Sequence, residues 1–194
     1  MSNAALHVAR TGLDAQNTKM RVIANNLANV NTTGFKKDRA DFETLAYQQI
    51  VQAGANSDAE NKFATGLNLG SGVALQGTSK INTQGTLTQT SNALDMAIEG
   101  SGYFQVQQPD GSIAYTRAGN FAVSPDGQMV TTDGYTVAPG IAIPQGARDV
   151  AINQQGQVQA ILDGDPTPQI VGQIELVNFF NEAGLEAVGD NLYL

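Results

Sequence analysis

Apolar side chains repeat every seven residues at the start of the chain, and this repeat constrains the fold more than any other feature. Each is followed three residues later by a second position of the same stripe, which is polar only at Gln16. The eight positions are Leu6, Ala9, Leu13, Gln16, Met20, Ile23, Leu27 and Val30. A strict seven-residue period places them in one narrow seam along an α-helix, as in a coiled coil. The sequence therefore predicts a heptad helix over residues 1–34 that requires a partner along this seam.

The partner of the seam is not evident in the sequence, because no second helical pattern of matching length follows. We expect the partner helix to come from another chain or from a C-terminal part of the protein beyond Leu194. The alternative is an amphipathic helix that lies on its own domain. A narrow seam suits a coiled-coil partner better than it suits a broad globular core.

From about Thr65 the pattern changes to short alternating or β-branched runs separated by glycine, which is typical of strands. The expected strands are 72–75, 86–89, 96–99, 103–107, 113–116, 121–123, 129–131, 135–138, 150–153, 158–161 and 170–177. Four Asp-Gly pairs mark turns between them. The expected fold class is mainly β, with an N-terminal coiled-coil-type α-helix, an extended linker loop and an antiparallel β domain that is sandwich- or barrel-like with many hairpins. The expected divisions are 1–34 for the helix, 35–90 for a connecting segment and 91–194 for the β domain.

A long loop is expected within the connecting segment, at residues 46–66. It is rich in Gln, Ala, Asn and Ser, and loops of this length are either functional or disordered. Its larger apolar side chains are candidate anchors, at Tyr47, Ile50, Val51 and Phe63. Ordering each residue costs about 1–2 kcal/mol in backbone entropy. We therefore expect the loop to be mobile in a free subunit and to be ordered by contacts within an assembly.

Asparagines gather near the end of the expected helix, on the side away from the seam. Asn25, Asn26 and Asn29 occupy heptad positions where an exposed helix normally carries Lys and Glu. An amide both donates and accepts hydrogen bonds, and it costs less to bury than a charge. We therefore expect these amides to form a subunit-packing face, which leaves the seam for an intrachain partner. Gly34 is expected to end the helix in a left-handed conformation.

The composition argues against several classes of function. A net charge of −8 argues against binding of nucleic acid, and the one basic cluster, Lys36, Lys37 and Arg39, is expected to be a solvated helix end. The chain has no cysteine and a single histidine, His7, so no catalytic residue, metal site or cofactor is expected. No apolar run approaches the ~18 residues of a membrane span, and no secretory signal is recognisable.

The order of several motifs resembles the bacterial flagellar rod and hook protein family. The first is Asn26-Leu-Ala-Asn-Val-Asn-Thr-Thr-Gly-Phe-Lys36, preceded by Thr11-Gly-Leu13 and Met20. Later landmarks of the family are similar to Gly100-Ser-Gly-Tyr-Phe-Gln-Val106, Tyr115-Thr-Arg-Ala-Gly-Asn-Phe121 and Gly127-Gln-Met-Val-Thr131. The loop after Tyr47, the run Gly66-Leu-Asn-Leu-Gly-Ser-Gly72 and the ending Gly184-Leu-Glu-Ala-Val-Gly-Asp-Asn-Leu-Tyr193 are most similar to the distal rod branch, with the proximal rod and hook branches as alternatives.

The resemblance implies a structural subunit without enzymatic activity, which stacks helically with copies of itself into the hollow shaft that carries torque through the periplasm to the hook. It also implies contacts with other rod proteins and with the hook protein, a place in the basal body, and export by the flagellar type III apparatus without a cleavable signal peptide. In the distal rod branch, the loop after the first helix is associated with rod stiffness and hook contact.

Members of the family typically end in a second heptad helix, which this sequence lacks, in agreement with the seam that has no partner. A standalone β-rich binding module with a helical tether is the alternative function. That alternative predicts an exposed aromatic patch on the β domain.

Overall fold

The computed structural model describes residues 2–58, 61–163 and 165–194. The chain divides into two compact units. The first, called the helix unit here, comprises Met1–Val30 and Lys37–Ile81. The second, called the β unit, comprises Asn31–Lys36 and Asn82–Leu194. Among the described residues, no helix is both long and apolar enough to cross a membrane.

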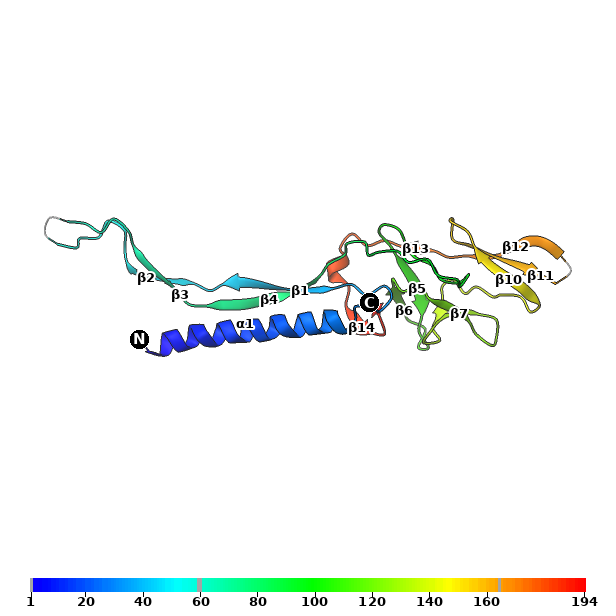
Figure 1. The fold of residues 1–194 in the computed structure, drawn as a ribbon, viewed down its shortest axis with the longest axis horizontal. Helices are drawn as coiled ribbons and strands as arrows, with labels where there is room; N and C mark the ends of the chain where they lie inside the picture. Colours follow the sequence, from blue (N-terminus) through cyan, green and yellow to red (C-terminus); the bar gives the residue numbers. More distant parts are fainter. Residues whose placement is uncertain (1, 59–60, 164) are drawn as a thin grey trace. The chain divides into compact units, whose positions relative to one another are not determined.

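The helix unit consists of one long helix and a long β-ribbon. Helix α1 (Ser2–Ala28) lies along the antiparallel pair formed by β1 (Asp38–Thr44) and β4 (Val73–Lys80) (Figure 1). Beyond this pair the ribbon continues as β2 (Tyr47–Val51) and β3 (Leu67–Gly70), which are also antiparallel.

The face of α1 that meets the ribbon consists of small and polar side chains together with two valines. The half-buried residues of the helix are Val8, Thr11, Gly12, Ala15, Thr18, Val22 and Asn26. The amide nitrogen of Asn26 donates to the Asp38 carbonyl oxygen at 2.8 Å, and its amide oxygen accepts from the Asp38 backbone N–H at 2.9 Å. Near the other end, the Thr11 hydroxyl accepts from the Val73 backbone N–H at 3.4 Å. Short side chains let the ribbon approach the helix closely, and the hydrogen bonds fix its position along the helix axis.

The helix ends at Ala28, so the expectation of a helix through residue 34 is wrong at its C-terminal boundary. The Asn29 N–H donates an α-helical hydrogen bond to the Asn25 carbonyl. The next bond, from the Val30 N–H to the Leu27 carbonyl, spans only three residues, as in a 3₁₀ turn. Because asparagine is a weak helix former, this run does not extend the helix further.

Gly34 does adopt a positive φ of 74°, but it does so in a turn beyond the helix. A Cβ atom at this position would lie 2.6 Å from the backbone nitrogen of Ala118. The glycine is therefore required for a close backbone approach within the β unit, and it does not cap α1.

The expected loop at 46–66 begins with a paired strand, which corrects the expectation of a loop without regular structure. Beyond β2 the two sides stay bonded: the Gly54 N–H donates to the Phe63 carbonyl, and the Phe63 N–H donates to the Ala55 carbonyl, both at 2.9 Å. We call residues 47–70 the arm. Its strands were missed because their side chains are mostly exposed, and only the short run Leu67-Asn-Leu69 in β3 alternates between apolar and polar residues.

The β unit contains two antiparallel sheets. The larger has the strand order β14-β15-β6-β5-β9-β8-β7, with β13 beside β5, and the smaller has the order β10-β11-β12. The larger sheet is built from β5 (Tyr103–Gln107), β6 (Ile113–Thr116), β7 (Phe121–Val123), β8 (Met129–Thr131), β9 (Thr136–Val137), β13 (Leu176–Val177), β14 (Ala187–Gly189) and β15 (Leu192–Tyr193). The smaller is built from β10 (Ala147–Ile152), β11 (Gln157–Leu162) and β12 (Asp165–Gln173), and a short 3₁₀ helix, η1 (Glu182–Gly184), precedes β14. The mainly β, antiparallel fold class is confirmed.

The two sheets share one hydrophobic core. Its buried members are Ile98, Phe104, Phe121, Met129, Val137, Ile141, Val158 and Ile174. The rings of Phe104 and Phe121 meet edge to face, with centroids 5.1 Å apart. Because Val158 comes from the smaller sheet and Phe104 from the larger, this core joins the two layers.

The strands around this core have the predicted boundaries, whereas several others do not. Strands β5 to β8 begin and end as expected, and the expected strand at 170–177 is divided between β12 and β13. In the part of the chain that the structure describes, residues 86–89 and 96–99 belong to no strand. The carbonyl of Ile98 instead accepts hydrogen bonds from the side chains of Gln84 and Arg117.

Replacing Gly119 with alanine should destabilise the β unit. A Cβ atom at this position would collide with the carbonyl oxygen of Met96, and that overpacking should cost about 1–3 kcal/mol. We expect a lower melting temperature for Gly119→Ala in a calorimetric scan. Gly85→Ala is the matched control, since nothing lies within 4 Å of its added Cβ. Equal melting temperatures for the two variants would contradict the packing described here.

The ribbon of the helix unit should weaken in acid through Asp41. Its carboxylate accepts hydrogen bonds from the Ser79 hydroxyl at 2.6 Å and from Arg39 at 2.8 Å, and these bonds hold the pKa of Asp41 below its ordinary value of 3.8. A carboxyl whose pKa is lowered by folding stabilises the fold above that ordinary value, and the contribution is lost as the pH falls through the lowered pKa.

Ser79→Ala should therefore raise the pKa of Asp41 towards 3.8 in an NMR titration, and Thr78→Ala on the same strand should not. An unchanged titration in Ser79→Ala would show that the hydroxyl does not stabilise the charged carboxylate.

Candidate assembly surface

The predicted seam is exposed along the whole of α1. All eight seam positions are exposed, and the exposed fraction of the large ones runs from 54% at Ile23 to 71% at Leu27. Val30 lies just beyond the end of the helix, so the seam within α1 ends at Leu27. An exposed apolar stripe of this kind, interrupted only by Gln16, marks an interaction surface.

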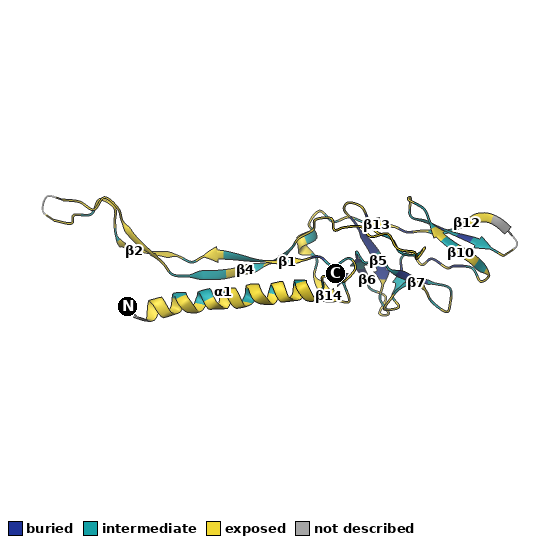
Figure 2. Cartoon of the chain, viewed as in Figure 1, coloured by how far each residue is buried: buried dark blue, intermediate teal, exposed yellow. Residues whose placement is uncertain are grey.

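One face of α1 is covered within the chain and the seam is not. From the sequence we expected a helix of another chain or of a C-terminal part on the seam, and neighbouring subunits on the asparagine face. Within the helix unit, the ribbon packs on the face opposite the seam, as the half-buried stripe along α1 in Figure 2 shows. The seam is consequently the face that remains accessible on α1.

The three asparagines of the expected subunit-packing face have different surroundings. Asn26 is half-buried, and its amide oxygen and nitrogen both bond the backbone of Asp38 within the chain. Asn29 donates to the backbone carbonyl of Asn25 at 3.0 Å and to its side-chain oxygen at 3.2 Å. The hydrogen bonds to the ribbon therefore account for the amide at Asn26. Packing of Asn25 and Asn29 against a neighbouring subunit stays a prediction.

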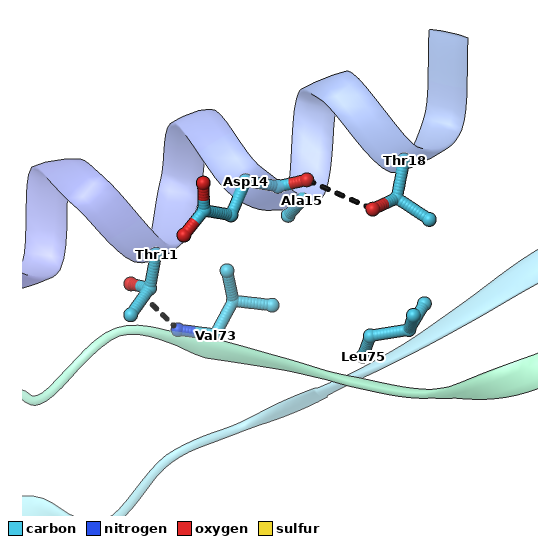
Figure 3. Close-up of a pocket in the computed structure, with 6 residues that line it drawn as sticks. All are labelled: Thr11, Asp14, Ala15, Thr18, Val73 and Leu75. Atoms are coloured by element: carbon cyan, nitrogen blue, oxygen red, sulfur yellow. Dashed lines mark hydrogen bonds between the residues drawn. The ribbon is translucent and has the colours of Figure 1, made fainter. Parts of the chain in front are cut away.

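A small groove lies between α1 and β4. It has a volume of about 150 Å³ and is lined by Thr11, Asp14, Ala15, Thr18, Val73 and Leu75 (Figure 3). The Thr18 hydroxyl donates to the Asp14 backbone carbonyl at 3.0 Å, so it serves the helix itself. Within the described part of the chain, no group of three or more His, Cys, Asp or Glu side chains is placed to hold a metal ion. The groove is therefore best understood as the space that short side chains leave beside the ribbon.

The arm exposes most of its expected anchors. Tyr47, Ile50 and Phe63 are exposed and Val51 is half-buried. Two further exposed apolar residues, Leu67 and Leu69, share one face of β3 because they are two positions apart. This pair was not predicted, although the alternation of the two leucines with Asn68 is the pattern of a strand.

Lys36 was expected at a solvated helix end, and the structure corrects this expectation. Only 7% of the residue is exposed, and its amine donates to the carbonyl oxygens of Thr83 at 3.0 Å and Asn82 at 3.4 Å. Burial lowers the pKa of the Lys36 amine, and the nearby charge of Arg117 lowers it further. Lys36 therefore holds the chain in place where Asn82 enters the β unit.

Arg117 has a similar role in the loop before β5. Its guanidinium donates to the carbonyls of Gly100, at 2.5 Å, and Gly102, at 3.1 Å, and it lies over the ring of Tyr103. These bonds fix the Gly-Ser-Gly turn that precedes the strand.

The aromatic residues on the outer side of the larger sheet pack mainly on one another. Phe179 meets the rings of Tyr103 and Tyr115 edge to face, and Tyr103 meets Tyr193 in the same way. Tyr103 and Tyr193 are buried, whereas Phe180 is fully exposed.

Comparison with known protein families finds one match near the start of the chain and another in the β unit. Residues 6–36 match the family described as flagella basal body rod protein, and residues 97–160 match the D1 domain of flagellar hook proteins FlgE, FlgF and FlgG. The first match covers the seam and the second covers most of the core strands of the β unit.

Several characterised proteins are similar to the chain over almost its whole length. Flagellar basal-body rod protein FlgG of Caulobacter vibrioides is 52% identical over 191 residues, which cover 98% of this chain and 73% of that protein. FlgG of Bacillus subtilis is 40% identical, over 97% of this chain and 72% of that protein. Flagellar hook protein FlgE of Treponema pallidum is 34% identical over 78% of this chain but only 32% of its own length. The chain therefore belongs to the flagellar basal-body rod protein family.

Proposed function

We propose that the chain is a structural subunit of the flagellar distal rod, which assembles helically with copies of itself into the hollow shaft that transmits torque through the periplasm to the hook. The observation that carries the proposal is the apolar seam of α1, which faces away from the ribbon that the helix packs against in its own chain. The similarity to rod proteins over nearly the whole chain supports it.

The free energy available along the seam favours assembly. Burial of a large apolar side chain contributes about 1.5–3 kcal/mol, and the seam exposes five such side chains within α1. Helices rely on tertiary packing for most of their stability, so α1 gains more from covering this face than from its own sequence. The covering helix is supplied by a neighbouring subunit or by a further heptad helix of the same protein, as in a coiled coil.

The arm suits contacts with neighbours for a related reason. A two-stranded hairpin by itself is marginally stable in water. The arm exposes apolar side chains at Tyr47, Ile50 and Phe63 that the chain itself leaves accessible. Contacts with neighbouring subunits or with the hook protein would bury these side chains and stiffen the shaft.

The charges of the two units also favour contact between copies through the helix unit. The helix unit carries seven Lys and Arg residues and six Asp and Glu residues. The β unit carries three Lys and Arg residues and twelve Asp and Glu residues. Near-neutral surfaces approach one another without the self-repulsion of a strongly acidic one.

The partners and location follow from the same proposal. The subunit contacts copies of itself, other rod proteins and the hook protein in the basal body, and it reaches this place through the flagellar type III apparatus. It acts by packing, with no catalytic step, cofactor or nucleic acid. Proximal rod and hook proteins are the alternatives within the family, but the match to a hook protein covers only 32% of that protein's length.

A charge in the seam should block assembly. Leu13→Asp or Leu27→Asp would force a carboxylate into the apolar contact, where burial without a partner is strongly unfavourable. We expect rods to be absent from micrographs of basal bodies and motility to be lost, while the melting temperature of the β unit is unchanged. Lys19→Asp on the same helix, outside the seam, is the control. Normal rods in both leucine variants would rule out the seam as an assembly surface.

Shortening the arm should affect the assembled shaft and leave the β unit intact. Tyr47 and Gly70 are cross-strand partners, so residues 48–69 can be replaced by an Asn-Gly turn. We expect an unchanged melting temperature of the β unit, together with a softened shaft or a defective junction with the hook in micrographs. A large drop in that melting temperature would show that the arm stabilises the subunit itself.

A further inference from the structure

Residues 85–90 of the β unit have the composition of a strand but belong to no sheet. Threonine alternates with Leu87 and Gln89, and β-branched residues favour strands. All six residues are exposed, and none of them belongs to a turn or bend. In the part of the chain that the structure describes, their backbone groups make no hydrogen bond to another residue. The segment therefore presents a bare strand edge to solvent.

Both ends of this segment are fixed by hydrogen bonds. Before it, the amine of Lys36 donates to the Thr83 carbonyl at 3.0 Å, and the amide of Gln84 donates to the Ile98 carbonyl at 3.2 Å. After it, residues 92–95 form a turn in which the Asp95 N–H donates to the Asn92 carbonyl. A segment whose two ends are already fixed loses less conformational entropy when a second strand pairs with it.

The edge strands of the smaller sheet carry features that discourage pairing. Natural proteins protect edge strands with charges and prolines. The edge strand β10 contains Arg148 and Asp149, and the edge strand β12 contains Pro168. The stretch 81–94 contains neither a charged residue nor a proline, and residues 85–90 are longer than the uncharged edge strands β7 and β14 of the larger sheet. Residues 85–90 therefore offer a longer unprotected edge to an added strand than these strands do.

The arm offers a second bare edge of the same kind. Its two strands pair only with each other in the described chain, so each has one edge without a neighbour. No charged residue occurs in 44–57 or 64–79, which include both strands. An edge of this type readily pairs with another strand.

We propose that residues 85–90 accept an edge strand from the arm of a second copy, which forms a β-ladder between subunits. The inference rests on the proposed self-assembly and names one contact within it. Two copies of the acidic β unit repel each other, whereas the uncharged strands of the arm approach the β unit without that cost. Donor and acceptor are different surfaces, so the contact repeats from copy to copy and builds an open helical assembly.

The absence of cysteine from the sequence permits a direct cross-linking test. Thr88→Cys protein would be mixed with Leu69→Cys protein, or with Gln49→Cys protein, under mild oxidation. We expect disulfide-linked pairs of unlike variants at several times the yield obtained when Gln154→Cys, in an exposed turn, replaces Thr88→Cys. A yield no higher than that of this control, or linkage of Thr88→Cys only to itself, would overturn the inference.

Hydrogen exchange provides a second measurement on the full chain. The amides of residues 85–90 should become protected as the protein concentration rises, and this protection should be lost in Thr88→Pro and in the variant with the shortened arm. Thr88→Val keeps the backbone N–H and should keep the protection. Protection that is independent of concentration would place the partner strand in the same chain and overturn the inference.

The two proposals fail in different ways. Rods that form normally from Thr88→Pro subunits, with residues 85–90 unprotected, would leave the proposed function standing and remove this contact. Rods that form normally from Leu13→Asp subunits would remove the seam from the proposed function, and the cross-linking yield would still decide the strand contact.

Discussion

The hydrogen-bonded contact between α1 and the ribbon determines which face of the helix the molecule offers to others. Asn26 bonds both backbone groups of Asp38, and Thr11 accepts a bond from Val73 near the other end of the helix. Two such contacts, far apart along the helix, fix its rotation about its own axis. The small side chains between them turn towards the ribbon, so the large side chains of the seam must point away from it.

The sequence predicts best where burial and turn chemistry agree. Strands β5 to β8 combine alternating apolar residues with Asp-Gly turns, and their boundaries are as expected. Within the ribbon, only part of β4 was expected, as the strand 72–75. The other strands were missed because β1 carries Asp38, Arg39, Asp41 and Glu43, and because β2 and β3 are mostly exposed. Such strands are stabilised by pairing along their length, and a single sequence does not reveal that pairing.

The residues of the proposed assembly surface could be named from the sequence, whereas the face of α1 that the ribbon covers could not. The seven-residue repeat identified the seam, and the asparagines identified a second face that differs from ordinary helix surface. What the sequence did not reveal is that the second face is occupied by the chain itself. The run of small residues at Thr11, Gly12, Ala15 and Thr18 was the available signal, since it permits a backbone to approach a helix closely. Lys36 was misjudged for a similar reason, because its acceptors are backbone carbonyls 46 and 47 residues away in sequence.

In the proposed assembly, the two faces of α1 have different roles, one in orienting the helix and the other in supplying free energy of association. A hydrogen bond contributes about 0.5–1.5 kcal/mol net, so the few bonds to the ribbon supply precise geometry and little binding energy. The seam supplies binding energy but little precision of geometry, because apolar burial is strong but does not depend on direction. A seam alone would let helices slide or rotate against one another, and a hydrogen-bonded ribbon alone would not hold subunits together. Because the ribbon sets the rotation of the helix before any partner arrives, each subunit presents the same apolar stripe in the same orientation, and a repeating shaft requires this uniformity from every copy.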